Sequence, residues 1–479
     1  MPDSPFRISY VADALYFLKR LLMKHQIRSE FSALWQLAWP VLIGQIATVG
    51  MGVADVAMTG HLNAEELAAV SLGTSVWTIV LVTVMGLMMA VNTVIAHETG
   101  AGREDRIPHQ MRQAMWLGLG GGLLACLLLN ASTFVFDHLS LDAPVAEKAK
   151  QFVHLISIGM PAFAMYRALY GYTTSLNQTK PVMVIALLGL AYNVLINWLF
   201  IYGHFGFPAL GASGCALATG SGLWLMLGAM LYWIRRSEAY QRTYPFAQAE
   251  APHWPEIRSM LKLGLPISVT YFAEVSAFCA VGLLIARFGV VEVAANQIAL
   301  NFSSLVFMVP LSIGIALTTR VGQALGEGDA DRARFISWVG VAAGLVFAVF
   351  SATLITVFRH VIAAAYTSDP AVQQLTATLL LFAAVFQLSD AAQVTTSCAV
   401  RGYKITRTPM LIHLTAFYGI ALPVGCLLGL APDWMPWPAS PMASQGFWVG
   451  LVSGLTVAGA LLLRFLHRVS LRALTGPAH

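Results

Sequence analysis

The sequence predicts an all-α, polytopic membrane protein with twelve transmembrane helices in two parallel six-helix repeats. Hydrophobic residues make up 57% of the 479 residues and charged residues only 11%, whereas about a quarter of a soluble domain is charged. Apolar stretches long enough to cross the hydrocarbon layer, which needs about 20 helical residues, recur along the chain. The predicted spans are residues 32–59, 67–97, 113–136, 151–176, 181–203, 211–234, 261–286, 292–322, 335–358, 373–399, 409–430 and 444–466.

The distribution of Lys and Arg predicts which side of the membrane each loop faces. If the N-terminus lies inside, the inner segments hold most of the 28 Lys and Arg residues, and the outer loops hold only Lys148, Lys150, Arg287 and Arg359. Cytoplasmic loops of membrane proteins carry such an excess of positive charge. We therefore expect both termini to be cytoplasmic, and the net charge of +5 then requires no nucleic-acid partner.

The second half of the chain repeats the first at a shift of 226 residues. Residues 37–41 (LAWPV) recur as 263–267 (LGLPI), and the loop 100–102 recurs as 326–328. Each copy holds six spans, so the repeat is parallel and its pseudo-twofold axis should run along the membrane normal. Two lobes that rock against a central cavity suit alternating access, which a simple pore would not need.

The spans and the repeat divide the chain into five expected segments. These are a cytoplasmic amphipathic segment (1–30), an N-lobe (31–235), a cytoplasmic linker (236–260), a C-lobe (261–467) and a cytoplasmic tail (468–479). Residues 8–28 mix apolar and basic side chains as a helix on an anionic membrane surface does, with a loosely ordered tail as the alternative. The five cysteines are scattered through the spans, which indicates packing rather than disulfides or a zinc site.

Three acids, Asp55, Glu274 and Asp390, lie inside spans that are otherwise almost free of charge. A carboxylate at mid-membrane costs roughly 2.5 to 3.5 kcal/mol by insertion scales, so it normally faces a bundle interior, a cavity or an ion path. Burial favours the protonated or ion-bound form of a carboxyl group. We expect these acids to take up H+ or Na+, with simple pairing to Arg or backbone as the alternative.

The rise of a helix places these acids at two heights. At about 1.5 Å per residue, Glu274 lies about 18 Å and Asp390 about 16 Å from the inner face, so the two could meet at one level. Asp55 lies about 28 Å from that face, in the outer half. By the same count Asn197 and Thr219 lie at about 26 and 24 Å, and Asn193, four residues before Asn197, shares its helix face.

Two sequence fragments begin enzyme motifs without completing them. His97-Glu98 matches the start of the zinc signature HExxH, but position 101 is Ala, so the second ligand is missing. The glycines at 118 and 120–122 lie in an apolar helix without the strand and Lys of a nucleotide loop, which indicates close helix packing. We expect neither an enzyme nor a cofactor.

The chain resembles a known family along nearly its whole length. The motifs that carry the resemblance are Pro40–Ile43, Gly50–Asp55, Phe272–Val275, Ala299–Met308, Phe382–Ala384 with Asp390–Ala391, Arg401–Lys404 and Gly446–Trp448. On these motifs it is identified as a member of the multidrug and toxic compound extrusion family, in the NorM branch. The resemblance implies drug efflux driven by inward Na+ or H+ through a V-shaped pair of lobes. It also implies a C-lobe cation site at Glu274 and Asp390, and an N-lobe site formed by Asp55, Asn193, Asn197 and Thr219.

One residue departs from the family pattern. Phe386, one turn before Asp390, stands where the NorM pattern has Tyr. A ring face can still hold a cation, but the hydroxyl is missing. This weakens the case for Na+ at Glu274 and Asp390, and the choice between Na+ and H+ stays open.

Four further polar residues have two interpretations each. Gln297 and Asn301, four apart on one helix, could line the C-lobe site or form interhelical hydrogen bonds. Arg167, the lone cation inside a span, could pair with a neighbouring helix or face the cavity. Asp369 before Pro370 is expected to cap a helix, with drug contact at the outer mouth as the alternative.

These observations lead us to expect a cation-coupled (Na+ and/or H+) antiporter that exports cationic drugs and dyes by alternating access. Drug and coupling cation would take turns on overlapping carboxylates, in a cavity that aromatic and Met side chains make adaptable. The alternative is a flippase for lipid-linked saccharides from the same wider superfamily, whose cavity usually carries several cations. We expect a monomer surrounded by membrane lipid in the bacterial inner (plasma) membrane.

Overall fold

The computed structural model describes residues 6–138, 142–431 and 441–475, with side chains from Gln26 onward. All regular elements in these ranges are helices, so the all-α prediction is confirmed. In chain order they are α1 (Phe6–Gly60), α2 (Ala64–Gly100), α3 (Ile107–Ser132), α4 (Val135–His138), α5 (Ala143–Ser157), α6 (Met160–Ser175), α7 (Lys180–Tyr202), η1 (His204–Gly206), α8 (Ala212–Arg236), η2 (Glu238–Thr243), η3 (Pro245–Ala247), α9 (Trp254–Ile285), η4 (Ala286–Phe288), α10 (Val290–Gly326), α11 (Ala330–Tyr366), α12 (Pro370–Gly402), α13 (Arg407–Leu414), η5 (Thr415–Ala421), α14 (Leu422–Leu430) and α15 (Ala443–Thr475).

The twelve predicted spans are present. Among the described residues, eleven helical segments are long and apolar enough to cross a membrane, and α5 and α6 together pass the same test as a twelfth. Several helices continue beyond the apolar run that predicted them. α10 and α11 have 37 residues each, which is about 55 Å of helix against a hydrocarbon layer of about 30 Å. The helix turns beyond the predicted spans contain polar residues, so a hydropathy average does not include them in a span.

The fourth span, predicted as one stretch (151–176), is broken into two helices. α5 and α6 meet at a bend of 43°. Pro161, in the first turn of α6, lacks the N–H that a continuous helix would use. Gly159 allows close contact with α8, because an added Cβ would lie 2.9 Å from a side-chain carbon of Leu223. Proline and close packing therefore set a bend that hydropathy did not reveal.

The N-terminal helix extends further back than the first predicted span. α1 is continuous from Phe6 to Gly60. The amphipathic segment expected at residues 8–28 lies almost wholly outside the residues whose side chains are described, so its contact with a membrane surface stays a prediction.

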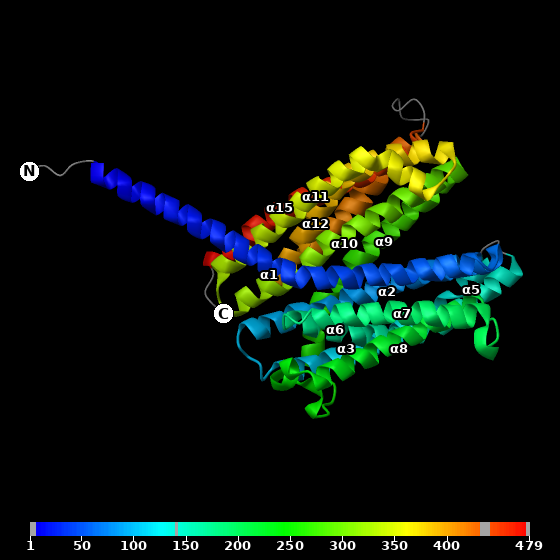
Figure 1. Cartoon of the computed structure of the whole chain (residues 1–479), viewed down its shortest axis with the longest axis horizontal. Coiled ribbons are helices and arrows are strands. Elements are labelled where there is room, and N and C mark those ends of the chain that lie inside the picture. Colours follow the sequence, from blue (N-terminus) through cyan, green and yellow to red (C-terminus); the bar gives the residue numbers. More distant parts are fainter. Residues whose placement is uncertain (1–5, 139–141, 432–440, 476–479) are drawn as a thin grey trace, which may run out of the picture.

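The helices form two lobes, α1–α8 and α9–α15, which η2 and η3 connect (Figure 1). α1 packs on α7 and α3 packs on α6 in the first lobe, while α12 packs on α10, α11 and α15 in the second. α2 packs on both α9 and α10 and so joins the lobes. We call the end of the bundle that holds residues 237–253 the linker end, and the opposite end the far end. The axes of the two lobes diverge from the linker end toward the far end (Figure 1).

A pair of equivalent hydrogen bonds connects the lobes at the linker end. His97 Nε2 of α2 bonds with Gly402 O at 2.8 Å, and Gln323 Nε2 of α10 donates to Ser175 O at 2.9 Å. His97 and Gln323 are 226 positions apart, and Ser175 and Gly402 are 227 apart, as the internal repeat requires. This pseudo-twofold pair agrees with the predicted parallel repeat.

Two repeat-related glycines bring the backbones of the lobes into contact at the same place. An added Cβ would lie 2.0 Å from Gln323 O at Gly100, and 2.2 Å from His97 O at Gly326. Among the described residues, the side-chain hydrogen bonds between the lobes all lie between the linker end and the middle of the bundle. The linker end is therefore closed by packed backbone and hydrogen bonds.

Candidate functional site

The first candidate site surrounds Asp55 of α1, in the far-end half of the first lobe. Asn193 and Asn197 of α7 donate through Nδ2 to Asp55 Oδ1 at 3.0 and 2.6 Å. Thr219 Oγ1 of α8 donates to Asp55 Oδ2 at 2.9 Å. Both asparagines are buried and Asp55 is half-buried. The four residues that helix rise and a shared helix face grouped together therefore lie in contact, and they come from three helices.

The donors around Asp55 are all uncharged. None of the ion pairs among the described side chains includes this acid. The amide oxygen of Asn197 is buried without a hydrogen-bond partner, although such oxygens are normally paired. Carboxylate and amide oxygens are ligands that hard cations prefer. The cluster is chemically able to hold a small cation or a proton.

The second candidate site lies in the second lobe at Asp390 of α12. This residue is 3% exposed, and Gln393 Nε2 donates to its Oδ1 at 3.1 Å. Gln393 Oε1 contacts His413 Nε2 of α13, and His413 Nδ1 bonds with Pro409 O at 2.7 Å. Gln393 and His413 are also buried. A chain of three buried polar side chains therefore runs from α12 to α13.

Sequence reasoning did not single out Gln393 or His413. The signal was present, because Gln393 lies one turn after Asp390 and His413 is a titratable residue inside an apolar span. His413 also closely precedes the π-helical turn η5, and such turns are frequent at functional sites. What the sequence could not supply was the contact between α12 and α13.

Glu274 of α9 is half-buried and makes no side-chain hydrogen bond in the described part of the chain. Glu274 and Asp390 lie on α9 and α12 of the same lobe. If their carboxyl groups share one site, the like charges favour the uptake of a proton or another cation. Glu274 and Asp390 are thus a second candidate acidic site, separate from Asp55.

Phe386, one turn before Asp390, belongs to the aromatic core of the second lobe. It is 4% exposed and meets Phe278 and Trp448 edge to face, with ring centroids 6.0 and 5.7 Å apart. The Phe386 ring has no polar atom. It therefore packs beside Asp390 and cannot supply an oxygen ligand to a cation.

Three other candidates form no hydrogen bond to the acids of either site among the described residues. Gln297 and Asn301 are exposed on α10 and make no side-chain hydrogen bond to another described residue. The adjacent Asn296 is buried instead and accepts from Trp448 Nε1 at 3.0 Å. Asp369 caps α12, accepting a hydrogen bond from the backbone N–H two residues later at 2.8 Å. The roles of Gln297 and Asn301 at the C-lobe site, and of Asp369 in drug contact, stay predictions.

Arg167 of α6 lies at the interface of the lobes. Together with Arg401 it lines a cavity of about 20 Å³, which has room for about one water molecule. The guanidinium carbon of Arg167 lies 4.1 Å from the ring centroid of Tyr170, a cation–π contact. Arg167 forms no ion pair among the described side chains, and a cavity of this size cannot hold a drug, so both predicted roles stay predictions.

A family model and several relatives match most of the chain. The MatE family model matches residues 40–199 and 266–427, and its second match begins 226 residues after its first, which is the shift of the internal repeat. The multidrug resistance protein PmpM of Pseudomonas aeruginosa is 42% identical over 93% of both chains. The probable multidrug resistance protein NorM of Chromobacterium violaceum is 42% identical, over 94% of this chain and 96% of that one. The multidrug resistance protein MdtK of Yersinia pseudotuberculosis is 40% identical, over 91% and 94%.

Solved structures share the fold at lower identity. The eukaryotic MATE transporter AtDTX14 has a TM-score of 0.84 at 19% identity, covering 93% of this chain and 98% of that one. An outward-facing multidrug resistance MATE family transporter has a TM-score of 0.84 at 18% identity, covering 93% and 96%. These structures support the fold alone, whereas the family model and the relatives at 40–42% identity decide the family. This chain belongs to the multidrug and toxic compound extrusion family, in its NorM branch.

Proposed function

We propose that this protein is a cation-coupled antiporter that exports cationic drugs and dyes by alternating access. The observation that carries the proposal is a pair of acidic sites in separate lobes, at Asp55 and at Glu274 with Asp390. None of these acids takes part in an ion pair among the described side chains. A carboxylate kept free of fixed cations can exchange a small cation for a cationic substrate. The names of the relatives, which are multidrug resistance proteins, support the substrate class.

The contacts between the lobes support alternating access. The linker end is held shut by the close backbone approach at Gly100 and Gly326 and by the equivalent hydrogen bonds of His97 and Gln323. The same contacts must break for the opposite state to form, because the glycines leave no space for a small sliding movement. Cation binding to an acidic site would favour one of the two states by its difference in affinity for them.

The hydrogen bonds around His413 favour H+ as the coupling cation of the second lobe. Pro409 O is an acceptor, so His413 Nδ1 carries a hydrogen. His413 Nε2 faces Gln393 Oε1, also an acceptor, while the Gln393 amide nitrogen donates to Asp390. With the Gln393 amide in this orientation, Nε2 carries a hydrogen as well, and a histidine with two N–H groups is a cation. In this state the Gln393 amide connects an Asp390 carboxylate to a His413 imidazolium.

Turning over the Gln393 amide gives a second state with the same proton count. The amide oxygen then accepts from a protonated Asp390, and the amide nitrogen donates to a neutral His413. The two states differ in whether His413 or Asp390 holds the proton. Without this proton, the Gln393 amide oxygen faces either the Asp390 carboxylate or the bare ring nitrogen of His413. Two acceptors then face each other in a buried place, which costs free energy. The missing hydroxyl at Phe386 also favours H+ over Na+ here, while the oxygen ligands around Asp55 suit either ion.

We place the protein in the bacterial inner membrane as a monomer, with both termini in the cytoplasm. The linker end would face the cytoplasm, because the segments that meet there hold most of the Lys and Arg. The far end would face the outside, where the lobes diverge. Entry of H+ or Na+ from outside would then displace a bound drug outward.

Dye transport into inside-out membrane vesicles tests this function. With an acidic lumen and no Na+, wild-type protein should accumulate a fluorescent organic cation. Glu274→Gln and Asp390→Asn should each abolish accumulation at unchanged protein level. Wild-type transport in either variant would remove that acid from the mechanism. If neither an H+ nor an Na+ gradient drove any organic cation, the proposal would fail and the flippase alternative would gain support.

A further inference from the structure

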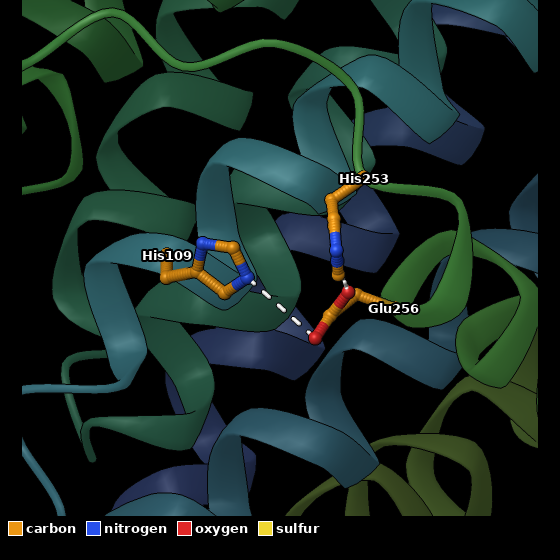
Figure 2. A group of neighbouring side chains, drawn as sticks. All are labelled: His109, His253 and Glu256. Atoms are coloured by element: carbon orange, nitrogen blue, oxygen red, sulfur yellow. Dashed lines mark hydrogen bonds and ion pairs between the residues drawn. The ribbon is translucent and has the colours of Figure 1, made fainter.

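A cluster of two histidines and two glutamates lies at the linker end, outside the acidic sites of the membrane spans. His109 lies in the first turn of α3, His253 directly precedes α9, and Glu256 lies in the first turn of α9. Figure 2 shows His109 and His253 both reaching toward Glu256. One ligand atom from each of these three side chains lies within 4.8 Å of the others. The cluster thus joins α3 of the first lobe to α9 of the second.

The backbone around the cluster is held in place by α3. Gln113 Nε2 donates to Ala251 O at 3.1 Å, and His253 N donates to Gln113 Oε1 at 2.7 Å. Trp116 Nε1 donates to Glu250 O at 2.8 Å. Hydrogen bonds at Glu250, Ala251 and His253 therefore hold this part of the linker against α3, which keeps His253 beside His109.

Glu250 orients His109. Glu250 Oε1 lies 2.7 Å from His109 Nδ1, and Arg112 Nε donates to Glu250 Oε2 at 2.6 Å. A hydrogen on Nδ1 leaves the lone pair on Nε2, and Nε2 is the atom that faces Glu256 Oε1 at 3.7 Å. A carboxylate that accepts from one ring nitrogen while the other faces the ion is the usual setting of a metal-binding histidine.

The ligand set and its spacing suit a divalent ion of the Zn²⁺ class. Such ions bind imidazole nitrogen and carboxylate oxygen at about 2.0–2.1 Å, usually with tetrahedral geometry, so their ligand atoms are about 3.3 Å apart. Atoms now within 4.8 Å of each other need only small side-chain rotations to reach that spacing. The side chain of His253 is 57% exposed, which gives an ion access from solvent. A cavity of about 250 Å³, lined in part by Glu256, Glu98 and Lys404, adjoins the cluster and leaves room for a water ligand.

We propose that His109, His253 and Glu256 bind one Zn²⁺-class ion, with Glu250 orienting His109, and that the ion joins α3 to α9. Three protein ligands leave the fourth position to water. Because the ligands come from both lobes, the ion stabilises the arrangement in which the linker end is closed. Export that requires the linker end to open is therefore slowed by the bound ion. This site is separate from the acidic sites and does not depend on which cation drives transport.

Metal binding is measured first on the purified full-length protein in detergent, after removal of any polyhistidine tag. Titration with Co²⁺ should give visible absorption bands of a tetrahedral site at one ion per chain, and Zn²⁺ should abolish them. His253→Gln and Glu256→Gln should each weaken binding at least tenfold, and Glu250→Gln by about tenfold. His360→Gln, at an exposed histidine of α11, is the matched control and should bind as wild type. Equal affinity in wild type and His253→Gln would overturn the site.

The consequence for the lobes is measured separately. Zn²⁺ should raise the melting temperature of the wild type and of His360→Gln, and should leave that of a His109→Gln, His253→Gln double variant unchanged. Zn²⁺ should also slow dye export by the wild type and not by the double variant. Tight binding that changes neither melting temperature nor export would overturn the proposed link between the lobes. The binding measurement needs no transport, so its result stands whether or not the proposed antiport is correct.

Discussion

Replacing His413 with Gln should stop proton uptake at the second lobe and leave the fold intact. A glutamine can still hydrogen-bond to Gln393, but it cannot carry the proton that His413 shares with Asp390. His413 is 2% exposed and Gln393 is 2% exposed, so bulk water cannot substitute for the lost N–H group. His413→Gln therefore tests whether residue 413 must carry a proton, because the hydrogen bond to Gln393 is kept.

The size of the effect follows from the hydrogen bond that is lost. A hydrogen bond to a charged group contributes about 1.5–3 kcal/mol, and about 1.4 kcal/mol corresponds to a tenfold change in rate. H+-driven export should therefore fall by about 10-fold to 150-fold. The free energy of unfolding should fall by no more than about 1–2 kcal/mol, because the glutamine keeps a neutral hydrogen bond.

The assay is dye accumulation in proteoliposomes under an imposed pH gradient, with the melting temperature measured on the same preparations. His360→Gln serves as the control for loss of a histidine. Wild-type export by His413→Gln would refute the reasoning.

Three further predictions concern the first lobe, the lobe contact and the helix cap. Asp55→Asn replaces the acceptor of three hydrogen bonds by a neutral amide. Because charge-assisted bonds contribute about 1.5–3 kcal/mol, dye export should fall at least about tenfold while the amount of protein in the membrane is unchanged. Gly100→Ala would place a Cβ 2.0 Å from Gln323 O, so it should weaken the closed linker end. The expected signs are a lower melting temperature and faster cysteine labelling at that end, and wild-type values of both would contradict the tight contact. Asp369→Ala removes the cap of α12 and should lower the free energy of unfolding by about 1 kcal/mol without changing export, whereas a loss of dye affinity at full stability would assign Asp369 to the outer mouth.

The positions of the spans could be read from the sequence because the membrane imposes a length and an apolar composition on each one. The fourth span was located correctly by this rule, yet its break between α5 and α6 was not anticipated. The bend depends on Pro161 and on the close approach of Gly159 to Leu223. Such a contact between distant parts of the chain leaves no mark on local hydropathy.

The two acidic sites were accessible to sequence reasoning in different degrees. Helix rise placed Asp55 near the height of Asn197 and Thr219, and a shared helix face added Asn193; these side chains do meet. Gln297 and Asn301 were predicted either to line the second-lobe site or to form interhelical hydrogen bonds, and both are exposed and form no side-chain hydrogen bond among the described residues. Height along a helix can be counted from sequence, whereas rotation about the helix axis depends on what the helix packs against.

The sequence by itself determined the twelve spans, the parallel repeat and the three acids within spans, because hydrocarbon excludes charge and so makes both apolar runs and their exceptions visible. Only the tertiary structure decided which side chains complete the sites. The row of side chains from Asp390 through Gln393 to His413 joins the consecutive helices α12 and α13, whereas the junction of His109 with Glu256 joins α3 to α9, which are distant in sequence. Their contacts are fixed by helix rotation and by the closing of one lobe on the other, which no local pattern of residues records.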